Sequence, residues 1–158
     1  MTWSQFSLTA DEQQELGDRF FFPTVAMFLA VALIDHPAGD EAEIGDICAV
    51  ARERSIAGDL ANFVSLDAVE ARLLVRRGRL SEAEALARRA VEAADRTDHF
   101  MMRARSRLAL ADVLQRARRA DEAAVPAREA VSFHVAKEDV AGAARVREQL
   151  AAFGIEVS

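Results

Sequence analysis

The amino-acid sequence predicts an all-α fold: a right-handed stack of about three antiparallel helical hairpins, with a repeat period of about 40, followed by a terminal helix. Three observations lead to this prediction. The 158-residue chain contains 33 alanines but only three prolines and seven glycines, and alanine is the strongest helix former. The chain also matches itself when residues 68–114 are aligned with 108–154. Small side chains recur seven residues apart in the predicted second helix of each hairpin.

The self-match indicates an internal repeat. Residues 68–114 and 108–154 are identical at 15 of 47 positions, where composition alone would give about four or five matches. Aligning Ala30 with Ala71 extends the match towards the N-terminus. The aligned small residues are Ala30, Ala71 and Ala111 in the first helices, and the pairs Ala42 with Ala49, Ala83 with Ala90, and Ala123 with Ala130 in the second helices.

The first part of the chain contains a capping segment and one hairpin. The stretch from Thr9 to Glu12 has the spacing of a capping box, which predicts a short helix. Pro23 suits the N-terminal edge of the next helix, where its missing N–H group has no partner to lose. The predicted elements are a capping segment over 1–19 with a helix from Ala10 to about Asp18, and hairpin 1 over 20–57 with helices over 24–34 and 42–54.

The later elements repeat the same plan. Gly78 suits the left-handed position at the end of a helix, and Ser81 and Asp121 suit the N-caps of the second helices. Pro126 is expected to bend its helix or to delay its start. The predicted elements are hairpin 2 over 60–97, hairpin 3 over 100–137, and a terminal helix over 139–154.

The small-residue positions resemble those of the tetratricopeptide repeat, in which helices cross closely at such sites. The resemblance covers roughly residues 23–153, with Gly78 and Leu80 at the turn. The long period and the missing early aromatic depart from the family pattern. The longer period is similar to the C-terminal repeat tails of large bacterial signalling proteins, such as adenylate or guanylate cyclases and ATPase-containing transcriptional regulators. Both an excised tail and a free-standing relative fit this resemblance.

The resemblance implies a non-enzymatic protein-interaction module, with a small-ligand sensor as the alternative. In tetratricopeptide arrays the first helices line a concave groove. The positions that would face this groove are Arg72, Arg76, Arg105, Asp112, Arg116 and Arg145. Arginines there suit the carboxylates of a peptide or of an acidic small molecule. The alternative interpretation is that they form the solvated face of amphipathic helices.

The sequence contains no motif for catalysis or cofactor binding. A phosphate-binding loop, a dinucleotide fingerprint, a paired zinc-binding HExxH motif and the common nucleophile motifs are all absent. We therefore expect no enzyme activity, no cofactor and no metal. His36, His99 and His134 are interpreted as loop or surface residues, and Cys48 as a small core residue.

Charge and hydropathy restrict the partners and the compartment. Acidic residues outnumber basic ones by 26 to 20, which argues against nucleic acid as a partner. The longest apolar run, residues 20–34, would rise only about 22 Å as a helix, less than the hydrocarbon core of a bilayer. Acidic residues precede this run, which argues against a signal peptide. We therefore expect a cytoplasmic protein without membrane or nucleic-acid partners.

The helix over 24–34 and the residues just before it are apolar on almost every side. A helix of this kind must be buried all round, although it lies at the edge of the predicted stack. The capping segment, a second copy of the chain or an upstream domain are the possible covers. We predict a homodimer through an edge formed by Phe20, Phe21, Phe28 and Val31. Residues 1–60 carry a net charge of −8 and residues 61–158 a net charge of +2, which also allows head-to-tail contact between copies.

Overall fold

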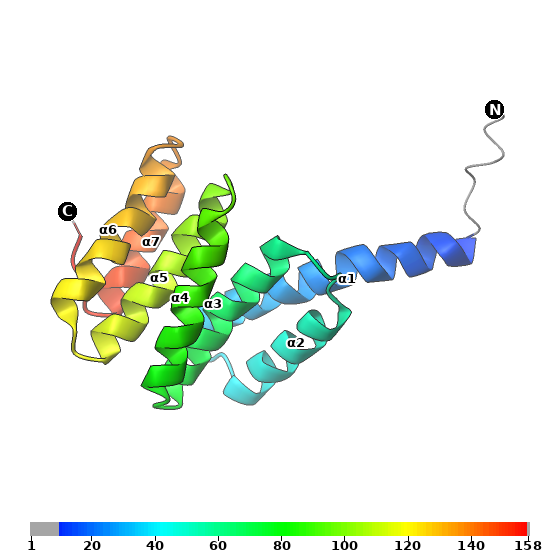
Figure 1. Ribbon diagram of the computed structural model, residues 1–158, viewed down its shortest axis with the longest axis horizontal. Helices are drawn as coiled ribbons and strands as arrows, with labels where there is room; N and C mark the ends of the chain where they lie inside the picture. Colours follow the sequence, from blue (N-terminus) through cyan, green and yellow to red (C-terminus); the bar gives the residue numbers. More distant parts are fainter. Residues whose placement is uncertain (1–9, 158) are drawn as a thin grey trace.

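A computed structural model describes residues 10–157, with side chains described from Phe21 onward (Figure 1). Over these residues the chain is all-α, with no strand. This confirms the all-α part of the predicted fold class. The helices are α1 Ala10–Asp35, α2 Glu41–Arg54, α3 Leu60–Arg76, α4 Leu80–Asp95, α5 Phe100–Arg116, α6 Ala120–Val135 and α7 Val140–Ala152.

The helices form two layers. The odd-numbered helices contact one another in series, α1 with α3, α3 with α5, and α5 with α7. The even-numbered helices cover this row: α2 packs on α1 and α3, α4 on α3 and α5, and α6 on α5 and α7. Figure 1 shows the same progression from blue to red along the molecule. Each helix therefore packs mainly on helices that are close to it in the sequence.

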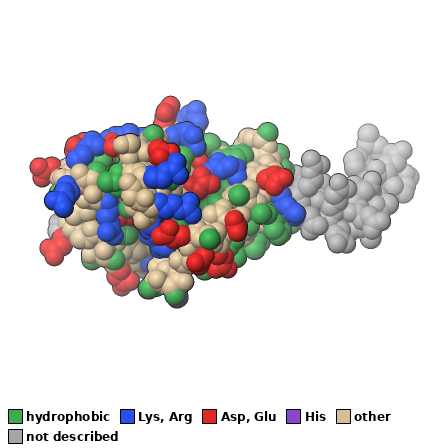
Figure 2. Space-filling view, turned by 90° about the horizontal axis from the view of Figure 1, so that it is seen from below, with side chains coloured by type: hydrophobic (Ala, Val, Ile, Leu, Met, Phe, Trp, Pro, Cys, Tyr) green, Lys and Arg blue, Asp and Glu red, His purple; other side chains and the backbone are tan. Residues whose placement is uncertain are grey.

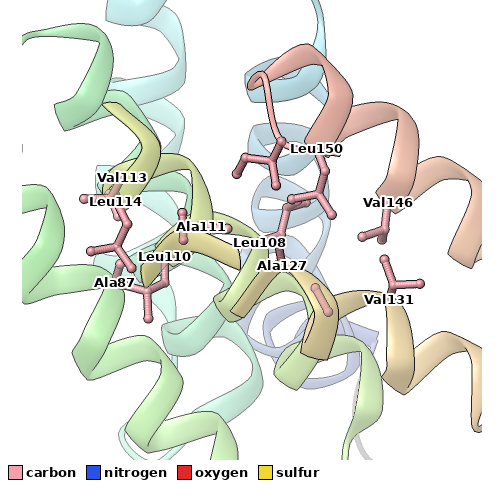
Figure 3. Packing of buried hydrophobic residues seen from close by; sticks show 14 of the residues in the cluster. Ala87, Leu108, Leu110, Ala111, Val113, Leu114, Ala127, Val131, Val146 and Leu150 are labelled. Atoms are coloured by element: carbon pink, nitrogen blue, oxygen red, sulfur yellow. The ribbon is translucent and has the colours of Figure 1, made fainter. Parts of the chain in front are cut away.

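Alanine side chains lie where the helices touch. Ala83, Ala90, Ala123 and Ala130 are fully buried, as the repeat predicted. A methyl group at these positions lets two helix backbones approach closely, which a longer side chain would prevent. The largest cluster of buried residues joins α3 to α7, and Figure 3 shows Ala87 of α4 beside Leu110 and Leu114 of α5. The spacing of small residues is thus a property of the core.

The prediction of which face of α2 is buried is wrong. Ala42 and Ala49 are exposed, whereas Ile44, Cys48 and Ala51 are buried. The buried positions of α2 therefore match the buried Ala83, Ala87 and Ala90 of α4, in that order. Larger apolar side chains at three-to-four spacing decide which face of a helix is buried. Because the chain contains so many alanines, matching single alanines of α2 to alanines of α4 did not show which face of α2 is buried.

The two short helices predicted near the N-terminus are one helix. α1 runs without interruption from Ala10 to Asp35, with Pro23 inside it and not at its edge. The proline removes one backbone hydrogen bond, but Pro23 is almost fully buried, so packing holds the helix together across this point. Pro126 likewise lies inside α6, and the helix still begins at Ala120. The predicted delay in the start of α6 is therefore wrong.

The N-caps predicted for α4 and α6 are also wrong. Arg79 and Arg119 hold the N-cap positions, and neither side chain makes a capping hydrogen bond. Each arginine instead pairs with a glutamate three residues later, in the first turn of its helix. Gly78 has a positive φ of 72°, as predicted for a helix end. Arg118 takes the same left-handed conformation one repeat later, with φ at 61°.

Candidate functional site

Two neighbouring hollows lie along the row of odd-numbered helices. The first hollow, with a volume of about 130 Å³, lies between α1, α3, α5 and α7. The second hollow lies between the end of α1, α3, α5 and the end of α7. Ile34, Asp35 and Arg72 line both. The apolar walls of the first hollow include Val31, Ile34, Val69, Met101, Leu108 and Val146, and its polar side chains are Asp35, Arg72, Arg105, His134, Arg145 and Gln149.

The structure brings all six predicted groove residues to these hollows. The first hollow is lined by Arg72, Arg105 and Arg145. The second is lined by Arg72, Arg76, Asp112 and Arg116. The helix positions that the tetratricopeptide resemblance assigns to the groove therefore lie on one side of the odd-numbered helices. Whether these side chains bind a partner stays a prediction.

Arg72 joins the two hollows but is already paired. Its guanidinium forms an ion pair with Asp35 of α1, and its Nε lies 3.7 Å from a carboxylate oxygen of Asp112 of α5. The guanidinium also lies 5.0 Å from the centre of the Phe153 ring. The side chain links α1, α3, α5 and the end of α7. Two carboxylates within reach leave Arg72 little free charge for a ligand.

Arg76 and Arg116 also have structural partners. Arg76 donates to the carbonyl oxygens of Ile34 and Gly39, at 2.7 and 3.2 Å. The carbonyl groups at the end of a helix lack partners within the helix, and a cation there opposes the helix dipole. Arg76 thus caps α1. Arg116 lies 3.5 Å from the Asp112 carboxylate, one turn earlier on α5.

Asp112 is a buried carboxylate between two arginines. Burial raises the pKa of its carboxyl group, while the charges of Arg72 and Arg116 act in the opposite direction. Its Oδ1 atom, like the Nε of Arg72, has no hydrogen-bond partner in the described part of the chain. Asp112 and Arg72 are therefore held together by the attraction of their charges more than by well-formed hydrogen bonds. This arrangement favours a structural role for Asp112.

Arg105 differs from the other groove arginines. It donates to the Ser65 hydroxyl at 3.1 Å, but it forms no ion pair with any described residue. Burial lowers the pKa of its guanidinium, and the charge of Asp35 only partly opposes this. Arg145 is exposed and likewise forms no ion pair with a described residue. The first hollow therefore holds two arginines with no carboxylate of residues 21–157 at ion-pair distance.

Sequence reasoning missed Asp67, a buried carboxylate that pairs with two arginines. Asp67 binds Arg52 of α2 at 2.7 Å and Arg89 of α4 at 2.9 Å, so it joins the two helices that flank α3. The sequence offered one sign that Asp67 is paired: it lies among the apolar residues of α3. A lone carboxylate on a buried helix face needs a partner. Arg107 forms a similar bridge, between Asp95 and Glu129. These clusters join residues that are distant in sequence, and they lie on the side that α2, α4 and α6 cover.

His134 is not a surface residue. It is buried, and its Nδ1 lies 2.8 Å from the carboxylate of Asp139, which caps the N-terminus of α7. Cys48 is buried as predicted, and burial raises the pKa of its thiol to about 12. A thiol with so high a pKa is a poor nucleophile. Among residues 21–157 no three His, Cys, Asp or Glu side chains lie together as a metal site would need.

An apolar stripe on α1 remains exposed. Phe21, Val25, Phe28 and Leu29 are between 48% and 73% exposed, and their spacing places them on one face of the helix. We call these four residues the α1 stripe. Val31, which was predicted to belong to this edge, is half-buried and lines the first hollow. The side chain of Phe20 lies outside the described residues.

Figure 2 shows hydrophobic side chains gathered at the right of the described surface, and basic and acidic side chains mixed over the rest of that face. None of the helices within residues 10–157 has both the length and the hydropathy to cross a membrane.

Comparison of the chain with protein-family models, with curated proteins and with solved structures finds no match.

Proposed function

We propose that this chain is a non-enzymatic protein-interaction module. Its helices would form a right-handed, tetratricopeptide-like stack of three hairpins and a terminal helix, acting as the scaffold or regulatory tail of a bacterial signalling protein. The serial contacts between helices and the buried alanines at repeating positions support such a stack. The arginines of the groove are mostly paired within the chain, so the groove is not the main docking surface of this proposal.

The observation that carries the proposal is the α1 stripe. With roughly 150–200 Å² for a full large apolar side chain, the exposed fractions of the four residues add up to about 400–450 Å². Phe22 beside them is 42% exposed and lies under the guanidinium of Arg54. A patch of this size is comparable to the largest apolar patch on a typical monomer, about 300–600 Å², which is often functional. Other exposed large apolar side chains, such as Val125, Val135 and Val140, lie on other helices, whereas the four residues of the stripe share one face of α1.

We propose a second copy of the chain as the partner of the α1 stripe. Two stripes packed face to face would remove about 800–900 Å² of apolar surface, which approaches the roughly 1,000 Å² of a specific interface. A single helix face of four large residues is also self-complementary under two-fold symmetry. An interface at this lower limit predicts a dissociation constant in the micromolar range.

Sedimentation equilibrium between about 1 and 200 µM tests the proposal. The wild-type chain should shift from monomer to dimer over this range, whereas the double variant Phe21→Ser, Phe28→Ser should stay monomeric. The matched control is Val125→Ser, Val140→Ser, which removes two exposed apolar side chains elsewhere and should still dimerise. Equal helical circular dichroism shows that the variants are folded. A wild-type chain that is monomeric at 200 µM contradicts the proposed dimer.

A further inference from the structure

The first hollow is small, and helices form its walls. Its volume of about 130 Å³ is close to the roughly 150 Å³ of an engineered apolar cavity that binds benzene. Helices α1, α3, α5 and α7 contribute most of its walls, and His134 of α6 completes them. The space therefore suits a molecule of about six to nine non-hydrogen atoms and is too small for a folded partner.

Arg105 has no carboxylate of residues 21–157 at ion-pair distance. It donates to the Ser65 hydroxyl, and the Asp35 carboxylate, which lines the same hollow, is already in an ion pair with Arg72. A charged side chain that is largely removed from water is costly unless it is paired. A single anionic group placed against Arg105 would remove this cost. Arg145, also free of ion pairs within residues 21–157, lines the same hollow and adds attraction for an anion.

The walls of the hollow next to this charge are apolar. Val69 of α3, Leu108 of α5 and Val146 of α7 line it, and all three are buried against other residues of the core. Fully hydrated anions such as phosphate or sulfate gain nothing from such walls. An anion that carries a short hydrocarbon group can bury that group here while its charge meets Arg105.

We propose that the first hollow binds a small monocarboxylic acid with a compact branched or aromatic group. The carboxylate accepts hydrogen bonds from Arg105, and the hydrocarbon part lies against the walls formed by Val69, Leu108 and Val146. This site is separate from the α1 stripe, and it gives the proposed interaction module a ligand to which it responds.

Titration of the full chain with benzoate and with 3-methylbutanoate, followed by isothermal calorimetry and by ¹⁵N–¹H NMR, tests this proposal. Both acids should bind with millimolar or tighter affinity and should shift the amide signals of α3, α5 and α7. Benzamide, which has the same shape without the charge, and acetate, which has the charge without the hydrocarbon, should bind at least tenfold more weakly. Absence of binding by both acids at 10 mM, or equal binding of benzamide and benzoate, would overturn the proposal.

Two arginine variants separate a binding role from a structural one. Arg105→Gln should weaken benzoate binding at least tenfold, because it removes the charge. Its melting temperature without ligand should stay the same or rise, since a half-buried charge without an ion-pair partner is lost. Arg147→Gln is the matched control: this arginine is exposed, lies on α7 and forms no ion pair with a described residue. Unchanged benzoate binding in Arg105→Gln would overturn the proposal.

The two proposals fail independently. The double variant Phe21→Ser, Phe28→Ser, which is designed to abolish dimerisation, should bind benzoate as the wild type does, because neither phenylalanine lines the hollow. Arg105→Gln should still dimerise. Loss of benzoate binding in the phenylalanine variant would overturn the placement of the acid in the first hollow.

Discussion

The replacement of Ala87 by leucine tests the packing of this fold most sharply. Ala87 is fully buried in α4, and Figure 3 shows it next to Leu110 and Leu114. Leucine adds three carbon atoms at a place where two helices touch. Such overpacking of a core costs about 1–3 kcal/mol, and the fully closed surroundings favour the upper half of this range. For a chain of this length that corresponds to a fall in melting temperature of about 4–10 °C.

The matched control is Ala85→Leu in the same helix. Ala85 is exposed, and leucine has nearly the helix propensity of alanine, so the free energy of unfolding should change by less than about 0.5 kcal/mol. Both variants can be measured by urea denaturation followed by circular dichroism. If Ala87→Leu is as stable as Ala85→Leu, close contact between the helices is not what places alanine at this position.

Three further predictions concern a glycine, a carboxylate and the cysteine. Gly142→Ala should lower the free energy of unfolding by about 1–3 kcal/mol, because a Cβ would overlap the carboxylate that caps α7. Gly45→Ala, which meets only ordinary contacts, should raise it by about 0.5–1 kcal/mol, and both values come from denaturant titration. The Arg107 guanidinium lowers the pKa of Asp95 below its ordinary value of 3.8, so this pair stabilises the folded chain above that pH and loses its effect as the pH falls through the lowered value. Asp95→Asn should therefore flatten the acid limb of a stability profile below pH 4, and an unchanged limb would contradict the pairing. Cys48 should not react with a thiol reagent at pH 8 until the chain unfolds, and reaction at the rate of a free thiol would refute its burial.

Sequence reasoning succeeded where a pattern was both local and repeated. The helices of the middle hairpin follow from their periodic apolar residues, and Gly78 at a helix end follows from its freedom to take a positive φ. The buried pairs Ala83 with Ala90 and Ala123 with Ala130 follow from the repeat itself. In each case the sequence pattern that predicts the feature lies within a few helical turns or recurs in the repeat.

The errors arose where packing between distant residues decides the structure. α2 buries Ile44 and Cys48, not the alanines that match by identity, because the larger side chains gain more from burial. α1 continues through Pro23 because the proline is buried against the core.

The candidate site shows the same limit. The offsets carried over from the tetratricopeptide resemblance selected the groove arginines, but they gave no account of the partners of these arginines. Arg72 meets Asp35 of α1 and Asp112 of α5, and both carboxylates are distant from it in the sequence. Within residues 21–157 the pairing leaves Arg105 and Arg145 without an ion pair, and only the structure identifies them.

The docking role of α1 is the central claim, and chemical cross-linking between two copies tests it most directly. Val25 lies in the middle of the α1 stripe, so two copies packed through this stripe should place their residues 25 close together. The variant Val25→Cys, treated with a short bis-maleimide at 50 µM protein, should give a covalent species of twice the 17.3 kDa chain mass. Ala85→Cys, at an exposed position of α4, should give none under the same conditions. Equal cross-linking of the two variants, or none in either, would contradict docking through α1.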